Sequence, residues 1–254
     1  MSTGLHSQDL RRACGALGLA FLVAAGHQAR ATEPPLVAAE REIVEASNAF
    51  RNGQGVAPLA VNDQLAAAAH AFAGFMARTG RYGHEADGRQ PTRRAQAQGY
   101  AWCLVAENIA MQYSSNGFAT GELAQRFVRG WIESPGHRRN LLDGAATETG
   151  VAVARSPTDG RYYAVQMFAR PAALRQRFEI SNRSARDVRY RLGEAGYALA
   201  PGSTRRHEQC VAQPLSVSLP GQAPIALQTR DGARWRIEGA GRELRLRDDT
   251  DGTR

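Results

Sequence analysis

The sequence predicts an α+β fold in which helices and a β-hairpin precede a small all-β region. Apolar residues recur at helical spacing in the first part of the chain, and the period then becomes strand-like. After Pro171, apolar and polar residues alternate between Gly- or Pro-containing turns, which is typical of short β-strands. The chain of 254 residues is 43% hydrophobic and 22% charged, a composition that excludes disordered and fibrous classes.

Four helices are predicted over residues 36–51, 62–80, 91–99 and about 118–134. The second begins at Asn62-Asp63, which are good N-cap residue types, and Gly80 stops it. Pro91 suits the first turn of the third helix. These boundaries rest on capping chemistry as well as on apolar spacing.

Strands follow the helices. Residues 149–154 and 162–169 are β-type runs separated by a turn that contains Pro157, Asp159 and Gly160, which predicts a hairpin. Beyond a boundary at residues 171–176, we expect five or six short strands over the remaining 80 or so residues, arranged as a small antiparallel sandwich or barrel. The predicted domains are therefore 36–171 and 174–254.

The N-terminus has the pattern of a secretory signal peptide at residues 1–31. Arg11-Arg12 precedes an apolar run from Ala13 to Ala25, and Ala29-Arg30-Ala31 is a small-x-small cleavage pattern. A retained transmembrane anchor is the alternative, but a membrane span needs about 20 apolar residues. We therefore expect cleavage near Ala31, no transmembrane anchor, and a secreted or periplasmic protein.

Cleavage would leave two cysteines, Cys103 and Cys210. An even number of cysteines in an oxidising compartment favours a disulfide between them. Two buried free thiols are the alternative, because nothing in the sequence sets the distance between the two.

All 32 basic residues are arginines, and the net charge is +8. The absence of lysine excludes Schiff-base chemistry and phosphate-loop or Ser-x-x-Lys mechanisms. Residues 32–173 are almost neutral, whereas 174–254 hold 15 arginines against 10 acids. Six of these arginines are expected on solvent faces of strands: Arg189, Arg191, Arg234, Arg236, Arg245 and Arg247. They form either a solvated sheet surface or a docking face for an anionic envelope polymer; export argues against nucleic acid as a partner.

Three segments of the first domain contain histidines and carboxylates outside the obvious apolar faces: residues 82–85, 106–110 and 131–142. Two imidazoles and a carboxylate that converge in a cleft could bind a divalent cation such as zinc and leave a position for water. Spacing alone does not establish such a site, because separated histidines commonly have structural roles.

Together these segments resemble the CAP superfamily, which comprises the cysteine-rich secretory proteins, antigen 5 and pathogenesis-related 1 proteins and is also called the SCP domain. The resemblance is to its bacterial branch and extends from about Val37 to Pro171. It is carried by 48–51, Pro58-Leu59, 65–76, His84, Asp87-Gly88, Gly99-Tyr100, 107–110, 131–142, 147–151 and 162–168.

The resemblance implies a CAP-type α-β-α sandwich with a His/Glu/Glu/His cleft, which binds zinc or other divalent cations in some members. Transferred to this sequence, the cleft contains His84, Glu107 and His137. The position of the second glutamate is occupied by Ser134, and Glu133 lies one residue earlier, about 100° around a helix. The predicted metal ligands are therefore His84, Glu107 and His137, with Glu133 and Ser134 as further cleft residues.

The preferred functional hypothesis is a secreted, non-catalytic binding protein whose cleft accepts a divalent cation and a lipid or other small apolar ligand, as the resemblance implies. One alternative is a metal-assisted hydrolase of peptides or cell-wall material, with His84, Glu107 and His137 as catalytic residues. The other is adhesion to an envelope or matrix polymer through the basic C-terminal domain.

Overall fold

The computed structural model describes residues 35–250. The predicted signal peptide and its cleavage site near Ala31 lie outside the described residues. In the part of the chain that is described, no helix is long and apolar enough to cross a membrane.

The first region contains helices on both sides of one sheet, and the second contains only strands and a short 3₁₀ turn. In chain order the elements are α1 (Leu36–Gly53), β1 (Ala60–Val61), α2 (Asp63–Thr79), α3 (Pro91–Ala97), β2 (Trp102–Gln112), α4 (Thr120–Glu133), α5 (Pro135–Leu141), β3 (Glu148–Arg155), β4 (Tyr162–Pro171), the 3₁₀ turn Ala172–Leu174, β5 (Gln176–Asn182), β6 (Val188–Leu192), β7 (Ala195–Leu199), β8 (Thr204–Gln209), β9 (Pro214–Ser218), β10 (Ile225–Gln228), β11 (Arg234–Glu238) and β12 (Arg245–Asp248).

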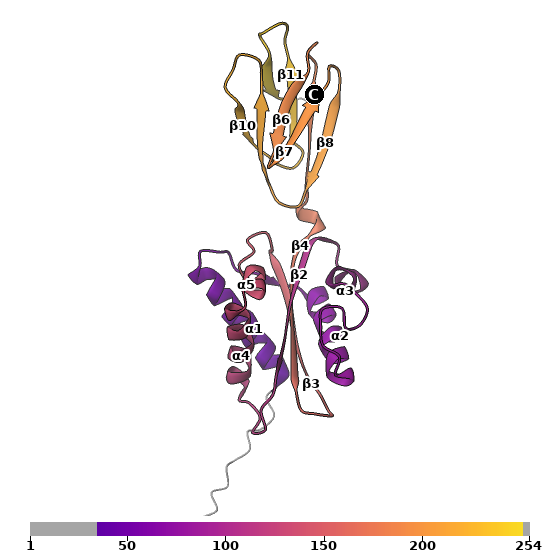
Figure 1. Cartoon of the computed structure of the whole chain (residues 1–254), viewed down its shortest axis with the longest axis vertical. Helices are drawn as coiled ribbons and strands as arrows, with labels where there is room; N and C mark the ends of the chain where they lie inside the picture. Colours follow the sequence, from indigo (N-terminus) through magenta and orange to yellow (C-terminus); the bar gives the residue numbers. More distant parts are fainter. Residues whose placement is uncertain (1–34, 251–254) are drawn as a thin grey trace, which may run out of the picture. The chain divides into compact units, whose positions relative to one another are not determined.

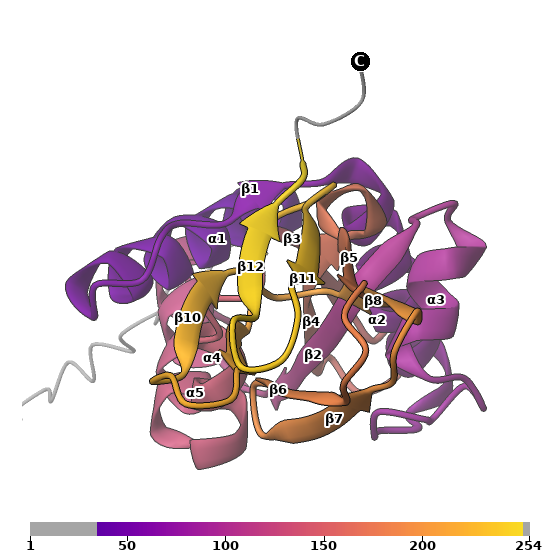
Figure 2. The same ribbon diagram turned by 90° about the horizontal axis from the view of Figure 1, so that it is seen from above.

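The first region is an α-β-α sandwich, as expected. Its sheet has the order β1-β3-β4-β2, so that β2 is an edge strand. Helices α1, α4 and α5 cover one face and α2 and α3 cover the other (Figures 1 and 2). Each face has its own apolar core: Trp131 and Phe127 of α4 lie in one, and Phe72 and Met76 of α2 in the other.

Capping chemistry sets the boundaries of α2 as predicted. The Asn62 side chain accepts hydrogen bonds from the backbone N–H groups of Gln64 and Leu65, at 3.0 and 3.1 Å. At the other end Gly80 adopts the left-handed conformation with φ of 69°, which glycine does without steric cost.

The helix α2 packs closely against β3 because of a glycine. A Cβ added to Gly150 would lie 2.1 Å from the backbone nitrogen of Ala66. No side chain fits in this gap, so Gly150 fixes the distance between the helix and the sheet.

The predicted hairpin is confirmed, since β3 and β4 pair antiparallel from Glu148↔Ala169 to Arg155↔Tyr162. Strand β2 pairs along the other side of β4 and was not predicted as a strand. Helix α5 was also not predicted, although Pro135 begins it as a first-turn proline.

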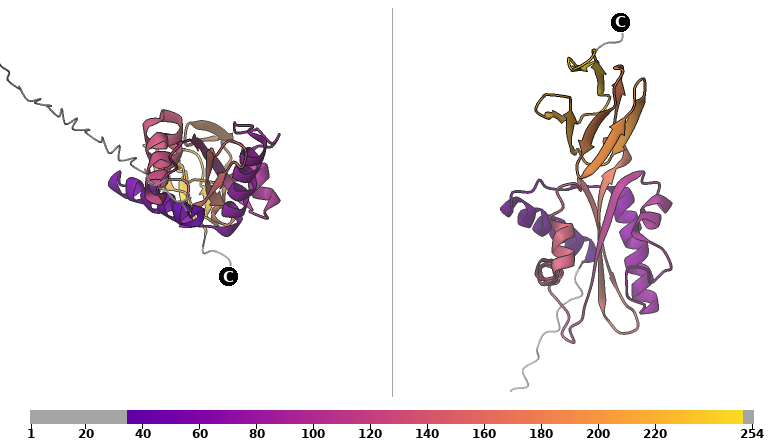
Figure 3. Two further views of the ribbon diagram at one scale, coloured as in Figure 1. Left: turned by 90° about the horizontal axis from the view of Figure 1, so that it is seen from below. Right: turned by 45° about the horizontal axis from the view of Figure 1, so that its top comes forward.

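The C-terminal region is built of strands, without an α-helix (Figure 3). The strands form two four-stranded sheets, β10-β9-β6-β7 and β12-β11-β5-β8, which share one apolar core. The expectation of five or six strands is therefore wrong. The apolar alternation at 178–180, 188–192, 215–219, 235–237 and 244–246 indicates only five of the eight strands, and β7, β8 and β10 were missed. The sheets are also not purely antiparallel: β5 and β11 pair parallel, from Arg234↔Glu179 to Ile237↔Asn182.

Cys103 at the start of β2 and Cys210 after β8 are joined in the structure by a disulfide with a Cα–Cα distance of 5.5 Å. This distance lies within the ordinary range for disulfides. The bridge links the sandwich to the C-terminal region at a second point, in addition to the chain at residues 172–175.

Candidate functional site

The three residues predicted for the cleft lie together at the free edge of β2. His84 comes from the turn after α2, Glu107 from β2 and His137 from α5. His84 Nδ1 lies 2.9 Å from Glu107 Oε1, and the ring centroids of His84 and His137 are 6.4 Å apart. The fold thus brings together side chains from positions 84, 107 and 137.

Two asparagines fix α5 beside β2. Asn108 Nδ2 donates to the carbonyl of His137 at 3.1 Å. Asn140 Nδ2 donates to the carbonyl of Glu107 at 3.2 Å and to Asn108 Oδ1 at 2.9 Å. Side chains alternate along a strand, so Glu107 and Asn108 point to opposite faces of the sheet. The carboxylate therefore faces α2 and α3 while its neighbour holds the helix that carries His137.

Sequence reasoning missed the residue that dominates this site, Arg94 of α3. Its Nη2 donates to Glu107 Oε1 at 3.0 Å and to Oε2 at 2.8 Å. Arg94 and Glu107 are only 3% and 4% exposed. A guanidinium shared between both oxygens of a buried carboxylate is a strong, charge-assisted pair, so the negative charge of Glu107 is compensated from within the chain.

Arg94 also organises the loop that carries His84. It donates to the carbonyl of His84 at 2.8 Å, to Asp87 Oδ1 at 2.8 Å and to the carbonyl of Arg89 at 2.7 Å. Its guanidinium carbon lies 3.6 Å from the ring centroid of Phe72, a cation–π contact. The only sequence signal for this role is an arginine next to the apolar face of a short helix, seven residues after Asp87.

The contact with Glu107 assigns the proton of the His84 imidazole, and burial affects the titration of His137. A carboxylate only accepts hydrogen bonds, so His84 donates from Nδ1 to Glu107 and keeps Nε2 for another partner. Burial, and secondarily the proximity of His84, lowers the pKa of His137 below its ordinary value. Burial thus favours the neutral form of His137 over the charged form.

A preformed three-ligand metal site does not fit this geometry. Glu107 already accepts hydrogen bonds at both oxygens. Two imidazoles on a tetrahedral zinc, with Zn–N near 2.1 Å, would have ring centroids roughly 5 Å apart. The observed 6.4 Å between His84 and His137 is longer. Among residues 35–250, no group of three His, Cys, Asp or Glu is arranged to hold a metal ion, so zinc binding stays a prediction.

The structure does not bring Glu133 to these residues. It ends α4, is exposed, and lines a separate polar groove with Gln112 and Arg129. Ser134 joins α4 to α5, and its carbonyl accepts a hydrogen bond from the backbone of Arg138. Within the described residues, its hydroxyl makes no hydrogen bond to His137. The helix does end at Glu133, but the turn at Pro135 leaves its carboxylate on the surface.

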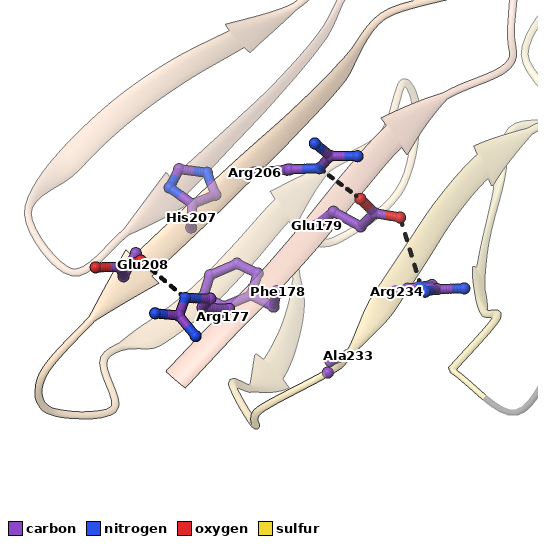
Figure 4. A pocket seen from close by; sticks show the side chains of 9 residues that line it. Arg177, Phe178, Glu179, Arg206, His207, Glu208, Ala233 and Arg234 are labelled. Carbon is purple, nitrogen blue, oxygen red and sulfur yellow. Dashed lines mark hydrogen bonds and ion pairs between the residues drawn. The ribbon is translucent and has the colours of Figure 1, made fainter. Parts of the chain in front are cut away.

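A pocket lined by both charged and apolar residues lies beside β5, β8 and the start of β11 (Figure 4). Its arginines are paired with acids: Arg177 with Glu208, and both Arg206 and Arg234 with Glu179, at 2.9, 3.2 and 3.6 Å. The six arginines predicted on solvent faces are all exposed or half-buried. Four of them have acidic partners: Arg191, Arg234, Arg236 and Arg247. Most of these sheet arginines are therefore paired with carboxylates of the same region, which still has five more arginines than acids.

Comparisons with known proteins find matches to the part of the chain that forms the sandwich. The model of the CAP family, described as the cysteine-rich secretory protein family, matches residues 44–168. An uncharacterised Bacillus subtilis protein, YkwD, is 31% identical over 118 residues, which are 46% of this chain and 43% of YkwD. The match thus spans less than half the length of that curated relative.

Some solved structures are also similar to part of this chain. An extracellular SCP-domain protein from Bacillus anthracis is 26% identical, with a TM-score of 0.45 over 53% of this chain and 41% of that protein. An outer surface protein of Borrelia burgdorferi is 19% identical, with a TM-score of 0.46 over 52% and 92%. Through residues 44–168, the chain belongs to the bacterial branch of the CAP superfamily.

Proposed function

We propose that the protein is a non-catalytic, extracytoplasmic binding protein whose CAP cleft takes a ligand between His84 and His137. The observation that carries this proposal is the engagement of Glu107 by Arg94 through both carboxylate oxygens. A carboxylate held in this way is a poor general base, because protonation would break a buried ion pair. It can still orient His84, which is what a binding site requires.

A divalent transition cation is one ligand that suits the two imidazoles. His84 is 49% exposed and has Nε2 available. Histidines that bind metals usually donate their other ring N–H to a carboxylate, as His84 does to Glu107. In this proposal Glu107 supports a ligand instead of being one, and His137 moves closer when the cation binds.

An apolar rim beside the cleft favours a small apolar ligand as well. Tyr82, two residues before His84, is exposed and has its ring centroid 6.3 Å from that of Tyr163. Met111 is opposite Tyr163 in the β2–β4 register and is also exposed. Exposed aromatic and sulfur-containing side chains next to a polar site are typical of ligand-binding surfaces.

A location outside the cytoplasm rests on two features of this chain. Its two cysteines beyond the predicted cleavage site form a disulfide in the structure, and disulfides persist in oxidising compartments. The N-terminal pattern at residues 11–31 is that of a signal peptide.

The test is a titration of the mature protein with zinc chloride and, separately, with a fluorescent fatty acid and a fluorescent sterol. Micromolar binding that is lost in His84→Ala/His137→Ala supports the proposal. The matched control is His70→Ala, which removes a 52% exposed imidazole of α2 outside the cleft. Absence of micromolar binding to all three probes, or binding that the double variant leaves intact, would reject the proposal.

The contact between His84 and Glu107 also suits a histidine general base, so a metal-assisted hydrolase is the second candidate. It predicts that protein supplied with zinc cleaves peptide or cell-wall substrates and that His84→Ala abolishes cleavage. Activity that persists in His84→Ala would exclude this site as its source.

A further inference from the structure

A concavity lies on the face of the sandwich that α2 and α3 cover, and one of its lining residues is Arg94, which also binds Glu107. It has a volume of about 300 Å³ and is lined by α2, the loop before α3, and α3 itself. This volume is at the lower end of the range for small-molecule sites. The pocket is therefore large enough for a small organic molecule.

One wall of the pocket is apolar. Helix α2 contributes Phe72 and Phe75, together with the small side chains of Ala68 and Ala71. The ring of Phe72 is buried beneath Arg94, whereas Phe75 is only partly buried. An aromatic ring of a ligand can pack against Phe75 and the alanines.

The polar side of the pocket is cationic. Arg78, Arg89 and Arg94 line it with one acid, Asp87. Asp87 already pairs with Arg94 Nη1 at 2.8 Å. Across residues 35–250, the guanidinium groups of Arg78 and Arg89 have no acidic partner and no hydrogen-bond acceptor. Two unpaired cations thus lie at an apolar wall, unlike the arginines of the C-terminal pocket, which are all paired.

Arg94 supplies an independent sign of a missing partner. Its two terminal nitrogens make five hydrogen bonds to Asp87, Glu107 and the carbonyls of His84 and Arg89. Its Nε is buried and has no acceptor in the part of the chain that is described. A buried donor without an acceptor is costly, so an anionic oxygen placed beside Nε would be stabilised.

We propose that this pocket binds a small aromatic carboxylate, with its carboxylate toward Arg78, Arg89 and Arg94 and its ring against Phe75. The positive charge of the arginines favours an anionic ligand. The apolar wall favours a ligand with an apolar group, which inorganic anions lack. Because Arg94 also holds Glu107 and the carbonyl of His84, a ligand here would contact the same side chain that shapes the histidine cleft. The proposal does not depend on what that cleft binds.

The experiment uses the full mature chain and three probes. The first, 3-phenylpropionate, has both a negative charge and an aromatic ring. Inorganic phosphate has only the charge, and 3-phenyl-1-propanol has only the ring. Calorimetric titration should show 3-phenylpropionate binding at least tenfold more tightly than either other probe. Arg78→Gln/Arg89→Gln should weaken that binding at least tenfold. The control Arg93→Gln, which removes an exposed arginine of α3 outside the pocket, should leave it unchanged.

A second measurement does not depend on the variants. In the wild-type protein, 3-phenylpropionate should shift the amide NMR signals of residues 68–78 and 87–98 and leave those of the C-terminal strands in place. The proposal is overturned if millimolar 3-phenylpropionate does not bind, if phosphate or the alcohol binds equally well, or if the double variant binds like the wild type.

Discussion

The two regions of the molecule contain arginine–carboxylate networks of similar composition in opposite surroundings. In the CAP domain, Arg94 joins Asp87 and Glu107 almost without contact with water. On the C-terminal sheet, Glu179 pairs with Arg206 and Arg234, whose side chains are 86% and 50% exposed. The chemical groups are the same, and only their access to solvent differs.

This difference in solvent exposure indicates in which region ion pairs determine the structure. An exposed pair exchanges readily with water and is worth about 0–1 kcal/mol. Removing one partner of a buried pair leaves an uncompensated charge and costs about 3–5 kcal/mol. Arg94 can therefore hold a loop, a strand and an imidazole in one arrangement. The exposed arginines of the C-terminal sheet mainly place charge beside open strand edges, which opposes aggregation.

The largest expected effect comes from Arg94→Met, because it leaves Glu107 buried without its cation. Denaturant unfolding should show a loss of about 3–5 kcal/mol. The neighbouring, exposed Arg93→Met is the control and should change stability by less than about 0.5 kcal/mol. A double variant, Arg94→Met/Glu107→Leu, should recover part of the loss, because Glu107 is no longer buried as an unpaired charge while Asp87 still lacks its partner. A loss below about 1 kcal/mol for Arg94→Met would show that water reaches Glu107. The two arginine–carboxylate networks would then not differ in their effect on stability.

A smaller effect is expected from the disulfide, which connects the two regions. The variant Cys103→Ser/Cys210→Ser opens a loop with a sequence separation of 107 residues. Such loops cost about 2–4 kcal/mol of stability when they are opened. Calorimetry should then resolve separate transitions for the two regions, so that each charge network can be measured in its own domain.

The wild-type protein treated with dithiothreitol provides the control for the disulfide. Its unfolding should approach that of the double-serine variant, on which the reductant should have no effect. Two titratable thiols in the untreated, denatured protein would show that Cys103 and Cys210 are not bridged.

The sequence is informative where a local chemical signal exists. Asn62 and Gly80 mark the ends of α2 because capping depends on residues within one turn. The hairpin β3–β4 is predictable because its strands are buried and its turn contains Pro157 and Gly160. Strand β8 was missed because it is almost entirely polar and has no apolar alternation.

The candidate site was only half predictable from the sequence. His84, Glu107 and His137 were found through a family resemblance that preserves their order. Arg94 was missed because its importance arises from long-range contacts: it meets Glu107 across the gap between α3 and β2. The parallel pairing of β5 with β11 escaped prediction for a similar reason, since two distant segments become neighbours only in the folded sandwich.

The smallest expected effect tests the exposed side of the comparison. Glu179→Gln removes the charge that Arg206 and Arg234 share on the outer sheet face (Figure 4). It should cost less than about 1 kcal/mol in dilute buffer. In about 1 M salt the Debye length falls to about 3 Å, so the difference from wild type should vanish. The cost of Arg94→Met should persist in the same salt, because ions do not reach a buried pair. A Glu179→Gln cost that is large and insensitive to salt would mean that the sheet network is as structural as the buried one, and the distinction between the two regions would fail.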